Sequence, residues 1–312
     1  MHKILSQRPL TPPYLALLDG VAALTDDWAE AEGVVAGAAT QFNETLFATT
    51  PKLRVVSRIG IGIDNIDVAA ATRYGVAVCN APDGPTISTA EHALALLLAV
   101  AKQIKVNERR VREEKRPFDF FSHNRGVEMF GKTLGVVGLG RIGRHMSRLG
   151  QGLGMTVIGY DPFAEAAEMA ALGVTLLPTL EAMLAQADVV TLHLPRTPET
   201  VGLMNETRLQ QMRPGAILIN AARGGIVDEA ALLAVLESGH LLGAGLDVFD
   251  IEPPASDHPL LLRSDVVVSP HVASGTDLGK HKMMKTAVLQ VVQVLQGIKP
   301  PHLVNPEVWQ GA

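Results

Sequence analysis

Three ionisable side chains stand where short apolar runs give way to turn residues. Arg223 lies in Asn-Ala-Ala-Arg-Gly-Gly, Glu252 precedes two prolines, and His271 lies in Ser-Pro-His-Val-Ala-Ser. A histidine can accept or donate a proton near neutral pH, and a neighbouring carboxylate stabilises its protonated form and fixes its orientation. An arginine can hold a carboxylate with two parallel hydrogen bonds and polarise the adjacent carbonyl. The set therefore suits acid–base chemistry on a substrate that carries a carboxylate.

Each of these residues also has an ordinary structural explanation. His271 is one of ten histidines, most of which in any protein are surface or core residues. Glu252 can simply begin a loop, and Arg223 can pair with Asp228. His193 competes for the acid–base role because it also ends an apolar run, but no acid follows it, so we expect it in a cofactor pocket. The common position of the first three at strand ends favours the catalytic interpretation.

A glycine cluster, Gly138, Gly140 and Gly143, separates an apolar run at residues 134–137 from a helix-like segment. Glycines let the backbone turn sharply and approach a pyrophosphate, to which a helix N-terminus offers its N–H groups. A second apolar run, 156–160, ends at Asp161, near the spacing expected of a ribose-binding acid. The pattern of strand, glycine turn, helix, strand and acid predicts a dinucleotide site.

The acid at position 161 also distinguishes between two cofactors. A carboxylate accepts hydrogen bonds from a free ribose 2′-hydroxyl and repels a 2′-phosphate, which would need a nearby arginine. No basic residue follows Asp161 until well downstream. We therefore expect NAD rather than NADP, and no metal.

Composition narrows the class of protein further. With 312 residues, 47% of them apolar and 19% charged, the chain has room for two packed domains. Its net charge of −5 argues against nucleic acid as a partner. The N-terminus lacks the apolar core of a signal peptide, and the longest apolar run, 93–101, is about half a membrane span. The single cysteine, Cys79, excludes an internal disulfide, so we expect a cytoplasmic protein without a membrane partner.

Strands and helices alternate on both sides of the glycine cluster, which predicts parallel sheets covered on both faces. A helix from 90 to about 112 is apolar nearly all round, so it must be buried, either as a core helix or in a dimer interface. Ligands of such sheets bind beyond the carboxyl ends of the strands. The expected strands are 33–36, 53–57, 75–79, 188–192, 216–220, 243–248 and 265–269, and the other expected helices are 13–18, 66–74 and 276–296.

Four motifs, in this order, resemble the signatures of the D-isomer-specific 2-hydroxyacid dehydrogenases. A further segment, residues 58–67, resembles that family's substrate-side loop in the form seen in phosphoglycerate dehydrogenases, and the resemblance covers residues 53 to about 306. The motifs are Gly138-Leu-Gly-Arg-Ile-Gly, Asn220-Ala-Ala-Arg-Gly-Gly, Gly245-Leu-Asp-Val-Phe-Asp-Ile-Glu-Pro-Pro and Ser269-Pro-His-Val-Ala-Ser.

The resemblance implies roles for individual residues. His271 would be the acid–base group, Glu252 its partner, and Arg223 the group that binds the substrate carboxylate during reversible hydride transfer between NAD(H) and C2 of a 2-hydroxy acid. Backbone N–H groups around Gly60, Ile61 and Gly62 would also hold the carboxylate. The implied NAD contacts are Gly138, Gly140, Arg141, Ile142, Gly143, Asp161, Leu194, Pro195, Ala222, Arg223, Asp247 and Ser274.

The resemblance also implies an architecture. Two doubly wound α/β domains are expected, with a Rossmann NAD-binding domain, residues 104–284, inserted into a flavodoxin-like substrate domain, residues 1–103 and 285–312. The family is usually dimeric through the cofactor domain, so a two-fold homodimer is expected. Because the chain ends at residue 312, no additional regulatory domain is expected.

The identity of the hydroxy acid stays open. Arg58 matches one of the basic positions that phosphoglycerate dehydrogenases use for the substrate phosphate, but an aromatic residue stands where a second is expected. Arg116, His123 or Arg125 can substitute for it, although a solvated loop residue is the simpler interpretation of Arg125. Both 3-phosphoglycerate/phosphohydroxypyruvate and hydroxypyruvate/glyoxylate fit. The alternatives are an unusual substrate, such as a sugar acid or phosphite, and a non-enzymatic NAD-sensing scaffold of the corepressor type.

Overall fold

The structure is a computed structural model that describes residues 1–114 and 126–309. Its contacts divide the chain into a first unit, Met1–Pro85 with Gly275–Ala312, and a second unit, Thr86–Ser274, which is inserted into the first. The expected boundaries, 103/104 and 284/285, lie further along the chain at both junctions. The difference arises because one long helix packs in the core of the second unit and the C-terminal helix packs on the sheet of the first.

The first unit is built on a sheet of parallel strands in the order β2-β1-β3-β4-β5, counted over the residues that the structure describes. This is the flavodoxin-like order, as expected. The strands are β1 (His2–Ser6), β2 (Ala22–Leu24), β3 (Gly33–Ala36), β4 (Val55–Arg58) and β5 (Ala77–Cys79). The helices are α1 (Pro12–Leu15), α2 (Glu44–Thr49), α3 (Val68–Arg73) and α12 (Asp277–Leu295), with 3₁₀ turns η1 (Ala16–Leu18) and η3 (Pro306–Val308).

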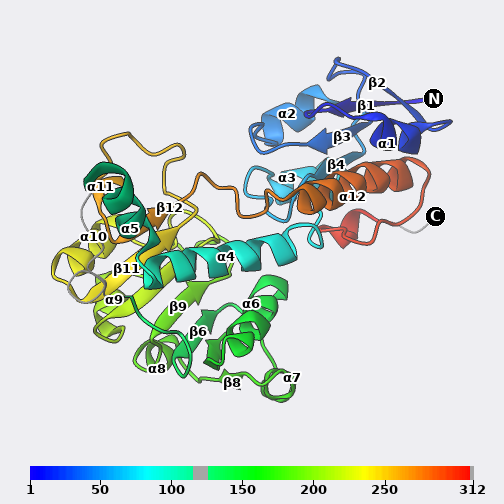
Figure 1. The fold of residues 1–312 in the computed structure, drawn as a ribbon. Helices are drawn as coiled ribbons and strands as arrows, with labels where there is room; N and C mark the ends of the chain where they lie inside the picture. The colour runs from blue at the N-terminus through cyan, green and yellow to red at the C-terminus, as the bar shows by residue number, and fades with distance from the viewer. Residues whose placement is uncertain (115–125, 310–312) are drawn as a thin grey trace. The chain divides into compact units, whose positions relative to one another are not determined.

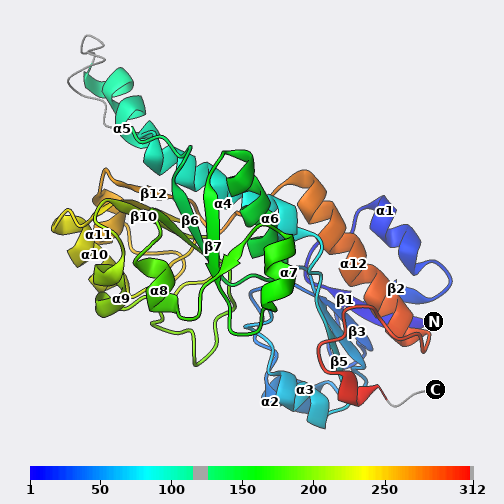
Figure 2. The ribbon, with the colours of Figure 1, turned by 90° about the horizontal axis from the view of Figure 1, so that it is seen from below.

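Successive residues of these strands point into two different cores. Ile4 and Val55 belong to a core with residues of α12, whereas Leu5 and Val56 belong to a core with residues of α2 and α3. Helix α12 lies on one face of this sheet, and α2 and α3 lie on the other (Figures 1 and 2). Because of this alternation, strand β1 can fill both cores with one apolar residue each. Its apolar run is therefore only two residues long, which is why this strand was not expected from the sequence. Helix α12 begins where predicted because Thr276 caps it by accepting a hydrogen bond from Gly279 N.

The edge of this sheet is covered by the segment that follows α12. Asn305 is fully buried, and its side chain accepts a hydrogen bond from Val78 N (2.8 Å) and donates to Val76 O and Thr72 Oγ1 (3.0 Å each). The side chain thus satisfies backbone groups beside edge strand β5 that no further strand pairs with in the described chain.

The second unit contains a parallel sheet in the order β12-β11-β10-β9-β6-β7-β8, again counted over the described residues. The chain order reverses direction between β6 and β9, which is the switch point of a Rossmann fold, as expected. The strands are β6 (Thr133–Val137), β7 (Thr156–Tyr160), β8 (Thr175–Leu176), β9 (Val189–Leu192), β10 (Ala216–Asn220), β11 (Leu241–Leu246) and β12 (Val266–Val268). The helices are α4 (Pro85–Ala101), α5 (Ile104–Arg109), α6 (Arg141–Gly152), α7 (Ala166–Ala171), α8 (Leu180–Leu184), α9 (Glu206–Gln211), α10 (Glu229–Glu237) and α11 (Pro259–Leu262), with a π-helical turn η2 (Arg110–Glu114).

Helix α4 packs directly on the second sheet. Its buried residues, among them Leu96 and Val100, join the core formed by β6, β7, β9 and β10. Two glycines of β11 let it approach closely, because a Cβ on Gly245 would lie 2.9 Å from Leu96 Cβ and one on Gly243 would lie 2.8 Å from Val100 Cγ1. The structure therefore confirms that α4 is a core helix.

The prediction of one continuous helix over residues 90–112 is wrong, because the structure divides this segment into α4 and α5. Helix α4 begins at Pro85, and Gln103 then adopts a left-handed conformation (φ 53°) before α5 starts at an angle of 61°. Lys105 holds the second segment in place by donating to Arg263 O and Val266 O (2.7 and 2.8 Å). No single described helix is long and apolar enough to cross a membrane, and α4 and α5 pass that test only as a bent pair.

We predict that Asn305→Ala lowers the free energy of unfolding by about 2 kcal/mol, because Val78 N–H and Val76 C=O would lose their buried partner. Urea denaturation measures this change, and faster hydrogen exchange at the Val78 amide provides a local readout. Gln296→Ala, at an exposed position after α12, is the control and should stay within about 0.5 kcal/mol of the parent. Equal stability of the two variants would contradict the role of Asn305.

Candidate active site

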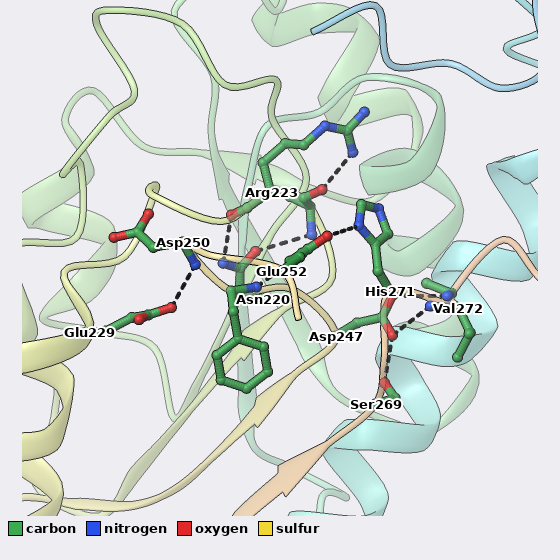
Figure 3. A network of polar contacts seen from close by, with 12 residues as sticks. Asn220, Arg223, Glu229, Asp247, Asp250, Glu252, Ser269, His271 and Val272 are labelled. Carbon is green, nitrogen blue, oxygen red and sulfur yellow. Dashed lines mark hydrogen bonds and ion pairs between the residues drawn. The ribbon is translucent and has the colours of Figure 1, made fainter. Parts of the chain in front are cut away.

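The second sheet brings together the three ionisable residues found in the sequence. Strands β10, β11 and β12 are neighbours in the sheet and run parallel. Arg223, Glu252 and His271 follow the carboxyl ends of these three strands and extend from adjacent turns (Figure 3). The carboxyl edge is where ligands of such sheets bind.

His271 and Glu252 form a direct pair. His271 Nδ1 lies 2.7 Å from Glu252 Oε2, while Glu252 Oε1 accepts a hydrogen bond from Phe249 N (3.1 Å). Both side chains are partly exposed, and within the described chain His271 Nε2 has no hydrogen-bond partner. The carboxylate therefore requires a proton on Nδ1, and Nε2 is the nitrogen that can exchange a proton with a substrate.

The pair borders a pocket of about 440 Å³ within the second unit. Its other walls include Phe249, Leu261 and Val268 and are mostly apolar. Arg223 does not line this pocket, which lies on the side of the pair formed by the loops after β11 and β12.

Arg223 sits on a turn that Asn220 braces. Asn220 Nδ2 donates to Arg223 O (2.9 Å), and Asn220 Oδ1 accepts from Ala222 N (3.0 Å). Arg223 Nη1 donates to Ala222 O (2.6 Å), so one terminal nitrogen of the guanidinium is bound to the turn that carries it. Asn220 is buried, and both polar atoms of its amide are hydrogen-bonded to the backbone of the turn. Its side chain therefore fixes the direction in which the turn leaves β10. Asp228, the alternative partner for Arg223, caps helix α10 by accepting from Ala231 N.

Asp247 holds the turn that carries His271. Its carboxylate is 1% exposed and accepts hydrogen bonds from Ser269 Oγ (2.6 Å), Val272 N (2.9 Å) and Ala273 N (2.8 Å). Its backbone carbonyl accepts from His271 N (2.7 Å). His271 itself has φ of +52°, in the left-handed region that non-glycine residues rarely adopt. The buried carboxylate thus stabilises a costly conformation at the residue expected to transfer a proton.

His92 and Asn220 were not among the expected site residues. His92, on α4, places Nε2 2.7 Å from Ser269 Oγ and 3.4 Å from Asp247 Oδ1. The signal in the sequence was a histidine at the start of the apolar part of α4, and for Asn220 it was an amide at the end of a strand, three residues before an arginine.

The glycine turn after β6 has the geometry that a dinucleotide needs. Gly138 has φ of +87°, and a Cβ there would lie 2.5 Å from His193 O. A Cβ on Gly143 would lie 2.0 Å from Gly138 O. At Gly140, by contrast, no protein atom lies within 4 Å of a Cβ, and this residue begins the twelve-residue helix α6 without a side-chain cap. Gly138 and Gly143 are required because a side chain there would collide with the backbone. Gly140 leaves room for a pyrophosphate at the helix N-terminus, so these residues fit NAD.

Asp161 ends β7 beside this turn. Its Oδ2 accepts a hydrogen bond from Leu139 N (2.8 Å) and its Oδ1 from Phe163 N (2.9 Å). Each carboxylate oxygen keeps a further lone pair for a ribose hydroxyl. Most of the remaining expected NAD contacts also lie at this edge of the sheet: Arg141 and Ile142 begin α6, Leu194 and Pro195 follow β9, Ala222 follows β10, and Ser274 ends the turn after β12. Asp247, which follows β11, is different, because its side chain is buried and its carboxylate is used by the turn over residues 269–273.

His193 differs from His271 in its environment. Burial lowers the pKa of His193 to about 4, so this side chain is neutral at physiological pH. Its Nε2 lies 2.9 Å from Thr191 Oγ1, and its Nδ1 is buried without a hydrogen-bond partner. A neutral, buried imidazole is a poor proton donor at physiological pH, and His271, which has a carboxylate partner, is the better candidate. In the described residues no group of three or more His, Cys, Asp or Glu side chains could hold a metal ion.

The expected substrate turn follows β4 in the first unit. Gly60 N donates to Arg58 O (2.9 Å), whereas Ile61 N and Gly62 N form no hydrogen bond there. Asn80 supports the turn by donating from Nδ2 to Ile61 O (2.9 Å). Arg58 donates from Nη1 to Ile59 O, so its guanidinium folds back on the same turn. The other basic candidates, Arg116, His123 and Arg125, lie outside the described residues.

Comparisons with known proteins agree with this geometry. Residues 94–273, more than half of the chain, match the family model "D-isomer specific 2-hydroxyacid dehydrogenase, NAD binding domain". A D-3-phosphoglycerate dehydrogenase of Mycobacterium bovis is 45% identical over 276 residues, which are 88% of this chain and 51% of that protein. The chain thus spans about half the length of the curated relatives it matches.

Solved structures match over nearly the whole chain. The TT0316 protein of Thermus thermophilus has a TM-score of 0.90 and 33% identity, covering 97% of this chain and 99% of its own. A D-lactate dehydrogenase of Aquifex aeolicus, solved with NAD and lactic acid, has a TM-score of 0.86 and 28% identity over the same shares. The chain therefore belongs to the D-isomer specific 2-hydroxyacid dehydrogenase family and carries that family's NAD-binding domain.

Proposed function

We propose that this protein is an NAD-dependent dehydrogenase that interconverts a small D-2-hydroxy acid and its 2-oxo acid. The observation that carries the proposal is the His271–Glu252 pair, with Nδ1 and Oε2 2.7 Å apart, at the carboxyl edge of an NAD-binding sheet. Such a pair provides the proton exchange that must accompany oxidation of a hydroxyl or reduction of a carbonyl.

Each residue has a defined part in this reaction. His271 Nε2 accepts the hydroxyl proton in oxidation and donates it in reduction, and Glu252 holds the ring and stabilises the imidazolium. Arg223 binds the substrate carboxylate and polarises the C2 carbonyl. Within the first unit, the N–H groups of Ile61 and Gly62 are not used by any described group and are suited to binding a carboxylate, whereas Gly60 N–H is already used within its turn.

The residues around Gly138, Gly140 and Asp161 hold the cofactor in this proposal. NAD supplies the hydride acceptor for oxidation, and NADH supplies the donor for reduction. The protein's own contribution is the α6 N-terminus for the pyrophosphate and the Asp161 carboxylate for the ribose, in agreement with the preference for NAD over NADP.

For the substrate, we propose 3-phosphoglycerate/phosphohydroxypyruvate first, since relatives of that name are 45% and 41% identical to this chain. Hydroxypyruvate/glyoxylate is the second candidate, because Arg58 is engaged within its own turn. A homodimer stays a prediction. A cytoplasmic location stays a prediction.

The proposal is tested by following NADH absorbance with phosphohydroxypyruvate, hydroxypyruvate, glyoxylate, pyruvate and branched 2-oxo acids. We expect turnover of at least one, and a loss of about 10²- to 10⁴-fold in kcat in His271→Asn, with the NADH Kd nearly unchanged. A preference for phosphohydroxypyruvate would assign Arg58 to the phosphate, and a preference for hydroxypyruvate or glyoxylate would leave it a structural residue. Wild-type protein that binds NADH but reduces none of these acids would contradict the proposal and favour a non-enzymatic scaffold or a substrate outside the 2-hydroxy acids, such as phosphite.

Replacing Glu252 by Gln should change the pH dependence of reduction. The amide can still accept the Nδ1–H bond, but it stabilises the imidazolium less than a carboxylate does, so the protonated donor is lost at a lower pH. The alkaline limb of the kcat profile should therefore move down by about one pH unit. Asp257→Asn, an exposed carboxylate of the same loop, controls for the charge change. Coincident profiles for Glu252→Gln and the parent would remove Glu252 from this role.

Replacing Asp161 by Asn should weaken the preference for NADH over NADPH. The amide oxygen can still accept one backbone hydrogen bond, while the charge that repels a 2′-phosphate is gone. Fluorescence titration should show weaker NADH binding and tighter NADPH binding. The Kd for NADPH divided by the Kd for NADH should fall about tenfold. Glu165→Gln, on an exposed residue next to helix α7, should leave the ratio unchanged. An unaltered ratio in Asp161→Asn would contradict the assignment.

A further inference from the structure

His92 is the polar residue through which helix α4 reaches the turn that carries His271. Its ring is half-buried, and Nε2 lies 2.7 Å from Ser269 Oγ and 3.4 Å from Asp247 Oδ1. The neighbouring positions on this helix, such as Ala90 and Ala93, are buried in the apolar core of the second unit. A histidine fixed at such a place has little freedom to turn toward solvent.

The directions of the hydrogen bonds follow from the donors and acceptors present. Asp247 Oδ1 and Oδ2 already accept from Val272 N and Ala273 N, so the carboxylate acts as an acceptor at both oxygens. Ser269 Oγ, 2.6 Å from Oδ1, must therefore use its only proton for Asp247. The remaining contact of that hydroxyl, to His92 Nε2, then has Nε2–H as donor and Oγ as acceptor.

This chain of bonds ends at the conformation of His271. Ser269 and Asp247 hold both sides of the turn over residues 269–273, and Asp247 O accepts from His271 N (2.7 Å). Within that turn His271 has φ of +52° and directs Nδ1 to Glu252 (Figure 3). A donor to Ser269 keeps the hydroxyl turned toward Asp247, and hence keeps the turn in its strained form.

We propose that His92 is a positioning residue for the acid–base reaction: its Nε2–H orients the Ser269 hydroxyl, which, with Asp247, holds His271 against Glu252. The inference rests on the proposed function of His271. Both the neutral tautomer with hydrogen on Nε2 and the protonated ring provide the required donor, so the role of His92 needs no charge. Packing alone would give a different result, because a side chain of similar size without a donor would then suffice.

The test compares His92→Leu, which removes the donor, with His92→Gln, whose amide nitrogen can replace Nε2–H. With the best 2-oxo acid of the panel, His92→Leu should lose about tenfold in kcat, since one buried hydrogen bond is lost. The NADH Kd and the KM of the oxo acid should stay within about twofold. His92→Gln should retain kcat within about threefold of the parent, and Glu91→Gln, at the exposed preceding position, should not change it.

A double-mutant cycle with Ser269→Ala makes the test specific. Both residues act through one hydrogen bond, so Ser269→Ala should resemble His92→Leu, and the double variant should lose no more than either single variant. If His92→Leu does not fold, His92→Met, a flexible apolar side chain without a donor, takes its place in the cycle. Three outcomes would each overturn the proposal. They are a double variant whose loss in kcat is the product of the two single losses, a His92→Leu variant with full kcat, and equal losses of kcat in the Leu and Gln variants.

Failure of this inference is distinguishable from failure of the proposed function. An inactive parent protein, or an active His271→Asn variant, would refute the function itself. An active parent, an inactive His271→Asn variant and a fully active His92→Leu variant would refute only the role of His92.

Discussion

The carboxylate of Asp247 is the group on which the geometry of the candidate site most depends. A buried carboxylate is costly unless its oxygens are satisfied, and here they receive the Ser269 hydroxyl and the backbone N–H groups of Val272 and Ala273. Those donors are available only if the chain after β12 turns back tightly. The same turn places His271 in a left-handed conformation and aims its ring at Glu252. The requirement to satisfy one buried charge thus fixes the acid–base pair.

A second constraint is the parallel order of the strands. Because all strands of the second sheet run in one direction, the turns that follow them collect at one edge. The glycine turn after β6 and the turns after β10, β11 and β12 therefore share this edge, although the sequence separates them widely. The strand order reverses between β6 and β9, the position at which sheets of this type bind their ligand.

The site also depends on how closely α4 packs against the sheet. Gly243 and Gly245 on β11 remove the side chains that would hold the helix away, so Leu96 and Val100 pack against the strand itself. That close approach brings His92, one turn earlier on the helix, within hydrogen-bond distance of Ser269. Apolar packing and polar positioning are thereby joined in one helix.

The sequence by itself determined the class of fold, and it predicted the glycine turn before α6 and the ionisable residues that the structure brings to one edge of the second sheet. These are local signals: the glycine spacing sets a turn that few other residues permit, Asp161 ends a recognisable strand, and His271 and Glu252 stand at strand ends. Helix α12 was also predicted to its ends, because Thr276 provides a cap that is legible in the sequence.

Only the tertiary structure decided the remaining features. The apolar run of strand β1, Ile4 and Leu5, is too short to be recognised alone, and the strand forms because its neighbours pair with both of its edges. The helix breaks at Gln103, and the segment after the break is held by hydrogen bonds from Lys105 to carbonyl groups more than 150 residues away in the sequence. The contact of His92 with Ser269 joins residues 177 positions apart, and no local pattern encodes such a distance. Long-range hydrogen bonds depend on the packing of whole elements, which is why the supporting residues of the site became visible only in the folded chain.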